Sequence, residues 1–328
     1  MAKQEFSIPA LTKRLVTEAD AYLLLEELRW NGQPEACPNC GEVGRCYYLN
    51  PANGVSRKTR TGAESQRRVW KCGGCRKQFS VLTGTIFQGT KVSVRTWLFV
   101  VFEMCASKNG VSAREIERKY DLTPKTAWFM LHRIREAMKL QPLAGLLSGT
   151  VVADETWIGG NPKNRHRNDP REAQRGYAAS DKTPVFSLVH YETRQARSRV
   201  VPNVSGATLL PAIAENADLP NTWLHTDAAR AYRHVAPHVA AHEFVTHESG
   251  EYVREGVSTN LAEGYFSQLK RSLDGTHHRV SVEHLDRYLA HFDFMYSHCR
   301  QTDSQRMRTL IGQVEGRRLT YKPLTARA

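Results

Sequence analysis

The stretch Val151-Val-Ala-Asp-Glu-Thr-Trp-Ile-Gly-Gly160 decides the fold of the C-terminal half of the chain. Its β-branched and aromatic residues, followed by two glycines, predict a strand over residues 150–158. Outward from this strand, apolar patterns of strand and helix period predict further elements. These are strands at 184–191, 196–201, 222–226 and 242–245, and helices at 208–217, 228–235, 259–273 and 283–299. A run of strands followed by alternating helices and strands is typical of one α/β domain.

Three acids lie on elements that such a domain brings together. Asp154 lies within the first strand, Asp227 ends the fourth strand, and Glu263 lies in the helix at 259–273. When a meander is followed by alternating helix and strand, the first and fourth strands are neighbours, so these acids can converge. The ribonuclease H-like fold builds its metal site in this way, and carboxylate oxygens suit magnesium or manganese. The element order therefore predicts a ribonuclease H-like domain with a site for divalent cations.

Each acid also has a structural interpretation. Glu155 could replace Asp154 as the functional acid, and it points to the opposite face of the strand. Asp227 could cap the helix that follows it. Glu263 stands three residues after Asn260 and could be the partner of a helix cap there. Because each acid alone fits a structural role, the prediction depends on all three occurring in the right order.

Paired cysteines predict a metal site in the N-terminal part of the chain. Cys37-Pro-Asn-Cys40-Gly and Cys72-Gly-Gly-Cys75 are two C-x-x-C pairs of the kind that form a zinc ribbon, with four thiolates in a tetrahedral shell. Four protein ligands leave no open position, so the metal would be structural. The spacing leaves zinc and iron open, and four incidental buried cysteines are the alternative.

A predicted helical pair follows the cysteines. Ser112 and Glu115 form a capping box, and Pro124 begins the second helix. The second helix has a buried apolar stripe that leaves basic residues to face outward, namely Lys125, His132, Arg133, Arg135 and Lys139. This is the arrangement of a helix-turn-helix, whose second helix enters a major groove of DNA. A plain helical hairpin would show the same stripe. The overall charge favours DNA binding, with Lys125 and Arg133 as contacts.

The charge of the chain indicates a polyanionic partner. It has 46 Lys and Arg against 33 Asp and Glu, a formal net charge of +13, and nucleic acid is the simplest such partner. Residues 57–77 carry eight Lys or Arg and one acid, which suits contact with phosphates or a solvated hairpin. The irregular stretch 161–182 carries six Lys or Arg and three acids, and is either a solvated insertion or a DNA-contacting loop.

Composition also indicates the cellular location of the protein and the boundaries of its domains. The first fifteen residues lack the apolar segment of a signal peptide, and no apolar run could span a bilayer. We therefore expect a cytoplasmic protein without membrane contact. Shifts in composition predict five parts: an N-terminal helical segment (1–30), a zinc ribbon (31–88), a helix-turn-helix domain (89–145), a ribonuclease H-like domain (146–300) and a basic tail (301–328).

These motifs together resemble a known family. The matching stretches are Leu28-Arg29-Trp30 before Cys37-Pro-Asn-Cys40-Gly, Asp154-Glu-Thr-Trp-Ile-Gly-Gly160, Thr226-Asp227 with Tyr232, the run from Asn260 to Arg271, Gly275-Thr-His-His-Arg-Val-Ser281, and His284-Leu-Asp-Arg-Tyr288. The chain resembles bacterial insertion-sequence transposases of the ISXO-like, Merlin-related group, which pair an N-terminal zinc ribbon with a DDE transposase domain.

The resemblance implies a function and roles for residues. Asp154, Asp227 and Glu263 would bind magnesium or manganese, and Lys270, Arg271 and Asn260 would contact DNA. The protein would bind terminal inverted repeats, cut and join double-stranded transposon ends and target, and act as a homo-oligomer. It would do so in a bacterial cell, associated with the nucleoid. The alternative is a catalytically inactive or domesticated zinc-ribbon and helix-turn-helix DNA-binding protein, and a generic nuclease of the same fold is a further one.

Overall fold

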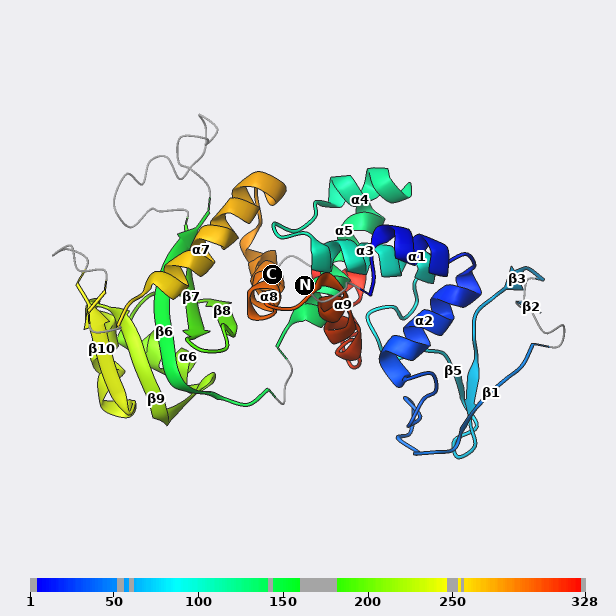
Figure 1. Ribbon diagram of the computed structural model, residues 1–328, viewed down its shortest axis with the longest axis horizontal. Helices are drawn as coiled ribbons and strands as arrows, with labels where there is room; N and C mark the ends of the chain where they lie inside the picture. Colours follow the sequence, from blue (N-terminus) through cyan, green and yellow to red (C-terminus); the bar gives the residue numbers. More distant parts are fainter. Residues whose placement is uncertain are drawn as a thin grey trace. The chain divides into compact units, whose positions relative to one another are not determined.

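The computed structural model describes residues 5–51, 56–58, 62–140, 144–159, 182–246, 253–254 and 257–325. The chain divides into two compact units: Met1–Met138 with Arg300–Ala328, and Lys139–Cys299. Figure 1 labels the elements of both units, which are described separately below. Within the described residues, none of the helices is both long and apolar enough to cross a membrane.

The first unit begins with α1 (Ile8–Arg14) and α2 (Glu18–Trp30). The side chain of Thr17 accepts a hydrogen bond from Asp20 N, while Asp20 accepts one from Thr17 N, so a capping box begins α2. Glu26 on α2 is buried and accepts hydrogen bonds from Trp70 Nε1 at 2.8 Å and Arg68 Nε at 2.7 Å. Because a buried carboxylate is costly without such partners, this contact fixes α2 against the segment that carries the second cysteine pair.

The cysteine-bearing segment folds as short strands. β1 (Cys46–Tyr48), β4 (Trp70–Cys72) and β5 (Gln78–Phe79) form an antiparallel sheet, and β2 (Arg57–Lys58) pairs with β3 (Glu64–Ser65). Four residues of the sheet segment are buried together, and Trp30 and Tyr48 pack against them: Cys37, Trp70, Cys72 and Phe79. So small a core cannot hold a fold alone, which is why ribbons of this kind need a metal.

The predicted helical pair is present in the same unit. α3 (Val94–Ala106) precedes α4 (Ala113–Tyr120), and Asp121 with φ 51° turns the chain into α5 (Pro124–Met138). Ser112 Oγ accepts a hydrogen bond from Glu115 N, as the capping box predicts. The described residues thus contain a helix, a short turn and a helix in the predicted places.

The C-terminal residues differ from the prediction of a separate basic tail. α9 (Asp303–Gly312) packs against α2, α3 and α5 of the first unit, and α10 (Tyr321–Thr325) follows. Met307, Leu310, Ile311 and Val314 are fully buried there. The net positive charge of this segment led to the prediction of a tail. The segment instead forms an amphipathic helix whose apolar side completes the core of the first unit.

The described part of the second unit is built on a mixed sheet. Its strands are β6 (Leu147–Ile158), β7 (Thr183–His190), β8 (Ala196–Val200), β9 (Ala217–Asp227) and β10 (Ala241–Val245), in the order β10-β9-β6-β7-β8. β6, β7 and β8 are antiparallel neighbours, whereas β9 runs parallel to β6 and β10 parallel to β9. The first strand therefore lies next to the fourth, as the predicted ribonuclease H-like order requires.

Helices cover both faces of this sheet (Figure 1). α7 (Asn260–Ser272) and α8 (Val282–Ser297) pack on the face that includes Val152, and α6 (Gly206–Ala214) packs on the face that includes Val151. Two element boundaries differ from the prediction. β9 begins at Ala217, where a helix end was expected, and the helix expected at 228–235 consists of short 3-10 turns, Arg230–His234 and Ala236–His238.

Candidate functional site

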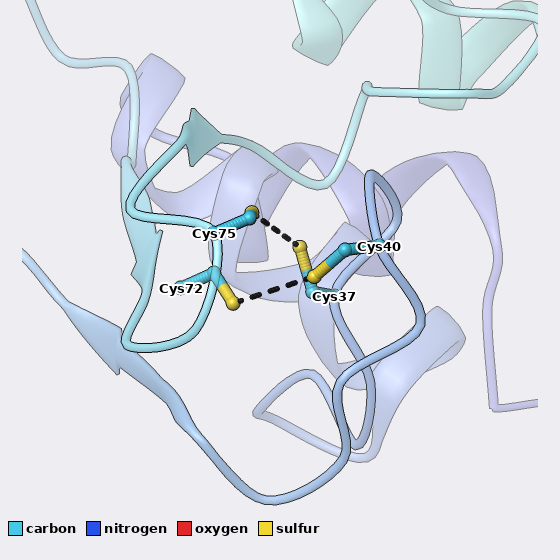
Figure 2. A group of neighbouring side chains, drawn as sticks. All are labelled: Cys37, Cys40, Cys72 and Cys75. Carbon is cyan, nitrogen blue, oxygen red and sulfur yellow. Dashed lines mark hydrogen bonds between the residues drawn. The ribbon is translucent and has the colours of Figure 1, made fainter.

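The four predicted cysteines converge in the ribbon, as Figure 2 shows. Cys37 Sγ lies 3.8 Å from Cys75 Sγ, and Cys40 Sγ lies 3.7 Å from Cys72 Sγ. All four sulfur atoms lie within 4.8 Å of one another. A tetrahedron with zinc–sulfur bonds of about 2.3 Å has edges of about 3.8 Å, so the cluster has the size of a zinc shell. These separations are too long for disulfides, and the four cysteines are free thiols.

The backbone around Cys37 favours its thiolate. Burial opposes ionisation of this thiol, but the N–H groups of Asn39 and Cys40 outweigh it and lower the pKa of Cys37 to about 7. Zinc binds thiolates, so this backbone arrangement suits a metal ligand. With four protein ligands the shell is closed, and a metal there would hold the ribbon together without reacting with a substrate.

Asp154 and Asp227 are brought side by side by the sheet. Val152 on β6 pairs with His225 on β9, so the same parallel register continued by two residues puts Asp154 next to Asp227. Side chains alternate along a strand, so Asp154 shares the face of Val152, the face that α7 and α8 cover. The predicted adjacency of the first and fourth strands thus places both aspartates on one face.

Glu263 is contributed by the first turn of α7, on that same face. The helix begins at Asn260 with Thr259 as its cap residue, and Glu263 Oε1 accepts a hydrogen bond from Thr259 Oγ1 at 2.9 Å. The alternative that made Asn260 the cap is wrong by one residue, because Asn260 already lies within the helix. Glu263 is exposed, and its negative charge acts on Asp154.

The three acids interact electrostatically. The pKa of Asp154 is raised to about 7, and burial is the largest cause of this rise. The charges of Glu155, Asp227 and Glu263 raise it further, while a hydrogen bond from Glu155 N lowers it. Like charges held together are unfavourable, and a divalent cation between them offsets both the repulsion and the burial. The chemistry of this donor set fits such a cation.

The acids nevertheless do not form a closed ligand shell. Within the described part of the chain, the group whose donor atoms converge tightly enough for one ion is the four cysteines, and the acids are not drawn into such a group. Asp227 Oδ1 accepts a hydrogen bond from Ala229 N at 3.0 Å, so this acid also fixes the turn after β9. The prediction that Asp227 caps a helix beginning at Ala228 is wrong, because the next 3-10 turn begins at Arg230 with Ala229 as its cap residue, and Asp227 instead stabilises the turn before it.

Glu155 lies on the opposite face, as the strand alternation predicts. Its Oε1 accepts a hydrogen bond of 2.6 Å from the hydroxyl of Tyr232, which is fully buried. Burial is the main cause that raises the pKa of Glu155 to about 7. In the sequence, Tyr232 is singled out only by the stretch around Thr226-Asp227 that resembles the family. Its spacing of five residues from Asp227 gave no signal that it would reach across to Glu155 on β6.

Some of the polar and basic residues predicted to face outward or contact DNA are exposed in the structure, and others are buried. Asn260, Lys270 and Arg271 are exposed on α7, and Lys125 is exposed on α5 with its Nζ 4.3 Å from the ring centre of Tyr321. The prediction that His132, Arg133 and Arg135 face outward is wrong, because all three are buried. The predicted loop at 161–182 lies almost wholly outside the described residues, which resume at Lys182.

The contacts of Arg133 explain why the helical pattern wrongly predicted an exposed side chain. Its guanidinium donates a hydrogen bond to Gln88 O at 2.7 Å and lies 5.1 Å from the ring centre of Trp97 and 5.3 Å from that of Phe129. Phe129 lies on α5 itself, whereas Gln88 and Trp97 belong to segments distant in sequence, and α9 packs against α5 as well. The helix is therefore covered on more sides than one amphipathic stripe would require.

Family models match both parts of the chain that carry these sites. A model of the ISXO2-like transposase domain matches residues 146–297, and a model of the transposase zinc-ribbon domain matches residues 16–78. The chain belongs to the ISXO2-like transposase family. The first match includes Asp154, Asp227 and Glu263, and the second includes the four cysteines of the ribbon.

Individual proteins are also similar to this transposase-family chain. An uncharacterized protein in transposable element ISH50 of Halobacterium salinarum is 27% identical over 307 residues, which cover 91% of this chain and 97% of that protein. Among solved structures, a chain from the simian T-cell lymphotropic virus intasome in complex with PP2A regulatory subunit B56 gamma is 15% identical, with 60% of this chain and 70% of that chain covered. Its TM-score is 0.28, too low to support an argument about the fold.

Proposed function

We propose that this protein is a DDE transposase that binds the terminal inverted repeats of an insertion sequence and catalyses metal-dependent DNA strand cleavage and strand transfer. The observation that carries the proposal is the placement of Asp154 and Asp227 on neighbouring parallel strands and of Glu263 on α7, which covers the same face of the sheet. Membership of the ISXO2-like family supports the same interpretation.

The three acids share the role of metal ligands in this proposal. Asp154 and Asp227, held by β6 and β9, and Glu263, held by α7, bind magnesium or manganese. Metal held by these acids would supply Lewis-acid chemistry, which would lower the pKa of an attacking water or 3′-hydroxyl and stabilise negative charge on the leaving oxygen of the phosphodiester. Thr259 positions Glu263 through its hydroxyl, and the turn at Ala229 positions Asp227. An open ligand set suits this role, because substrate phosphate must complete the coordination.

Exposed polar and basic side chains bind the DNA. Lys270 and Arg271 lie about two helical turns beyond Glu263 on α7, and Asn260 lies at the start of the same helix. Lys125 on α5 adds a contact from the first unit. Zinc bound by the four cysteines keeps the ribbon folded, so that the ribbon can also take part in DNA binding. Each chain offers one set of acids and an element has two ends, so we propose that a homo-oligomer performs the reaction.

One experiment tests this function directly. Purified protein is incubated with labelled duplexes of the element's ends and Mn²⁺, with a duplex of scrambled sequence as the matched control. The proposal expects nicking and joining at the ends and none on the scrambled duplex. Binding to the ends without cleavage would instead support an inactive or domesticated DNA-binding protein. Equal cleavage of both duplexes would support a generic nuclease.

A further inference from the structure

The ribbon sheet has an outer face that differs from its metal-bearing face. Tyr47 pairs with Lys71, and Lys71 pairs with Gln78, so these residues form one row across β1, β4 and β5. Their neighbours in sequence are the residues of the ribbon core around the cysteines: Cys46, Tyr48, Trp70, Cys72 and Phe79. Because side chains alternate along a strand, the row of Tyr47, Lys71 and Gln78, here called the outer ribbon face, points away from that core.

The outer ribbon face is open and chemically mixed. Tyr47 is 47% exposed, Gln78 is exposed and Lys71 is partly buried. Within the described part of the chain, the structure shows no side-chain hydrogen bond or ion pair for these three residues. A tyrosine offers a flat apolar ring and a hydroxyl, which is why this residue is enriched at interfaces. A cation and an amide in the same row add donors and an acceptor.

Two further cations lie in the turn at one end of this sheet. Arg76 and Lys77 are exposed in the turn that joins β4 to β5, and neither has an ion pair among the described residues. Glu42 is the acid near this turn, and it is already paired with Arg45 at 3.3 Å. The sheet therefore presents Lys71, Arg76 and Lys77 without a compensating negative charge in the described structure.

We propose that the outer ribbon face is a binding site for double-stranded DNA. Lys71 contacts backbone phosphate, while Tyr47 and Gln78 lie against the groove. Neighbouring strands are about 4.8 Å apart, and a major groove about 12 Å wide admits a two-stranded β-ribbon, so two adjacent strands of the row can lie against it. The uncompensated positive charge selects phosphate over a neutral protein surface.

This proposal deepens the proposed function and rests on DNA being the substrate. Binding is measured with the full-length, zinc-loaded Asp154→Asn protein, so that cleavage cannot disturb the result. The probes are a fluorescent duplex of the element's end and a duplex of scrambled sequence, each titrated over a series of salt concentrations. The variants are Lys71→Gln, Lys71→Arg and the double variant Tyr47→Ala/Lys71→Gln, with Lys13→Gln as the control, since Lys13 is an exposed lysine on α1.

The proposal expects Lys71→Gln to lower the slope of log affinity against log salt by about 0.9, the value for one lost phosphate contact. Lys71→Arg restores the slope, Lys13→Gln leaves it unchanged, and the double variant binds at least about tenfold more weakly. Zinc content must stay at one per chain, which separates a lost contact from a lost fold.

Two results would overturn it in distinguishable ways. If the parent protein binds both duplexes and all variants bind equally well, the outer ribbon face does not contact DNA, although the proposed function stands. If the parent protein binds neither duplex, the proposed function fails with it. A photoreactive phenylalanine at position 47 that crosslinks protein and not the duplex would assign the face to a protein partner and would also overturn the proposal.

Discussion

The ribbon and the acid site are built in opposite ways. In the ribbon, four sulfur atoms lie within 4.8 Å of one another, at the separations a tetrahedral metal requires. In the second unit, Asp154, Asp227 and Glu263 share a face and influence one another but do not close into such a shell. Neutral thiols can approach without repulsion, whereas carboxylates must be held apart until a cation joins them. A closed shell suits a metal that stabilises a fold, whereas an open set of acids suits the substrate site proposed above.

The largest expected effect tests the closed site. Cys72→Ser removes one of four zinc ligands, and zinc in small domains contributes about 10 kcal/mol or more to folding. We expect the variant to lose its zinc, as measured by atomic absorption, and the ribbon to unfold, as measured by the fluorescence of Trp70. Cys299→Ser is the control, since Cys299 is exposed and outside the cluster. A folded Cys72→Ser protein with one zinc per chain would contradict the closed shell.

The next effect tests the open site. Asp154→Asn should slow end cleavage by more than the roughly 100-fold that loss of a group outside a metal shell can cost. Because burial already raises the pKa of Asp154, a neutral amide there should not lower the unfolding temperature of the metal-free protein. This separates it from Cys72→Ser, which loses fold and function together.

Glu155→Gln is the matched control for the acid site. It keeps an oxygen for the Tyr232 hydroxyl, so cleavage should stay within a few-fold of the wild type. Loss of cleavage in Glu155→Gln together with an active Asp154→Asn would assign the catalytic role to the opposite face of β6.

A smaller effect compares two cations of α5. Arg133→Ala removes a buried guanidinium that packs on Trp97 and Phe129, so the first unit should lose about 2 kcal/mol of unfolding free energy in urea titrations. Lys125→Ala should change stability by less than about 0.5 kcal/mol and should instead weaken DNA binding at low salt. If Arg133→Ala were as stable as Lys125→Ala, the buried position of Arg133 would be wrong.

The smallest effect concerns a partly buried acid that lies outside both sites. Asp293 on α8 accepts hydrogen bonds from Ser198 N, Ser198 Oγ and Tyr265 OH, and burial raises its pKa to about 6. The carboxyl of Asp293 has a lower pKa in the unfolded chain than in the folded protein. It therefore adds to the stability of the folded protein at low pH, and this contribution is lost as the pH rises through about 6. Asparagine cannot titrate.

The wild type should therefore gain about 1 kcal/mol relative to Asp293→Asn between pH 7.5 and pH 5, measured by thermal unfolding. High salt should leave this difference in place, because a buried group is poorly screened. A difference that does not change with pH would show that Asp293 keeps an ordinary pKa.

Local patterns in the sequence were enough for the elements and the metal ligands. The two C-x-x-C pairs predicted the cysteine cluster, because two residues on a tight turn already point the same way and only the turns need to meet. The strand order predicted the adjacency of β6 and β9, which the register of Val152 and His225 confirms. Alternation along β6 predicted the opposite faces of Asp154 and Glu155 for the same reason, since the period of a strand is fixed by its backbone.

Contacts between distant segments were decided by the tertiary structure alone. Arg133 looked exposed from the pattern of α5, yet Gln88, Trp97 and Phe129 enclose it. The C-terminal residues looked like a basic tail, yet α9 completes the core of the first unit. Periodicity reports one buried side of a helix and says nothing about what covers the others. The sequence determined the cysteine cluster and the order of the elements that carry the three acids, and packing of remote chain segments decided which charged side chains remain exposed.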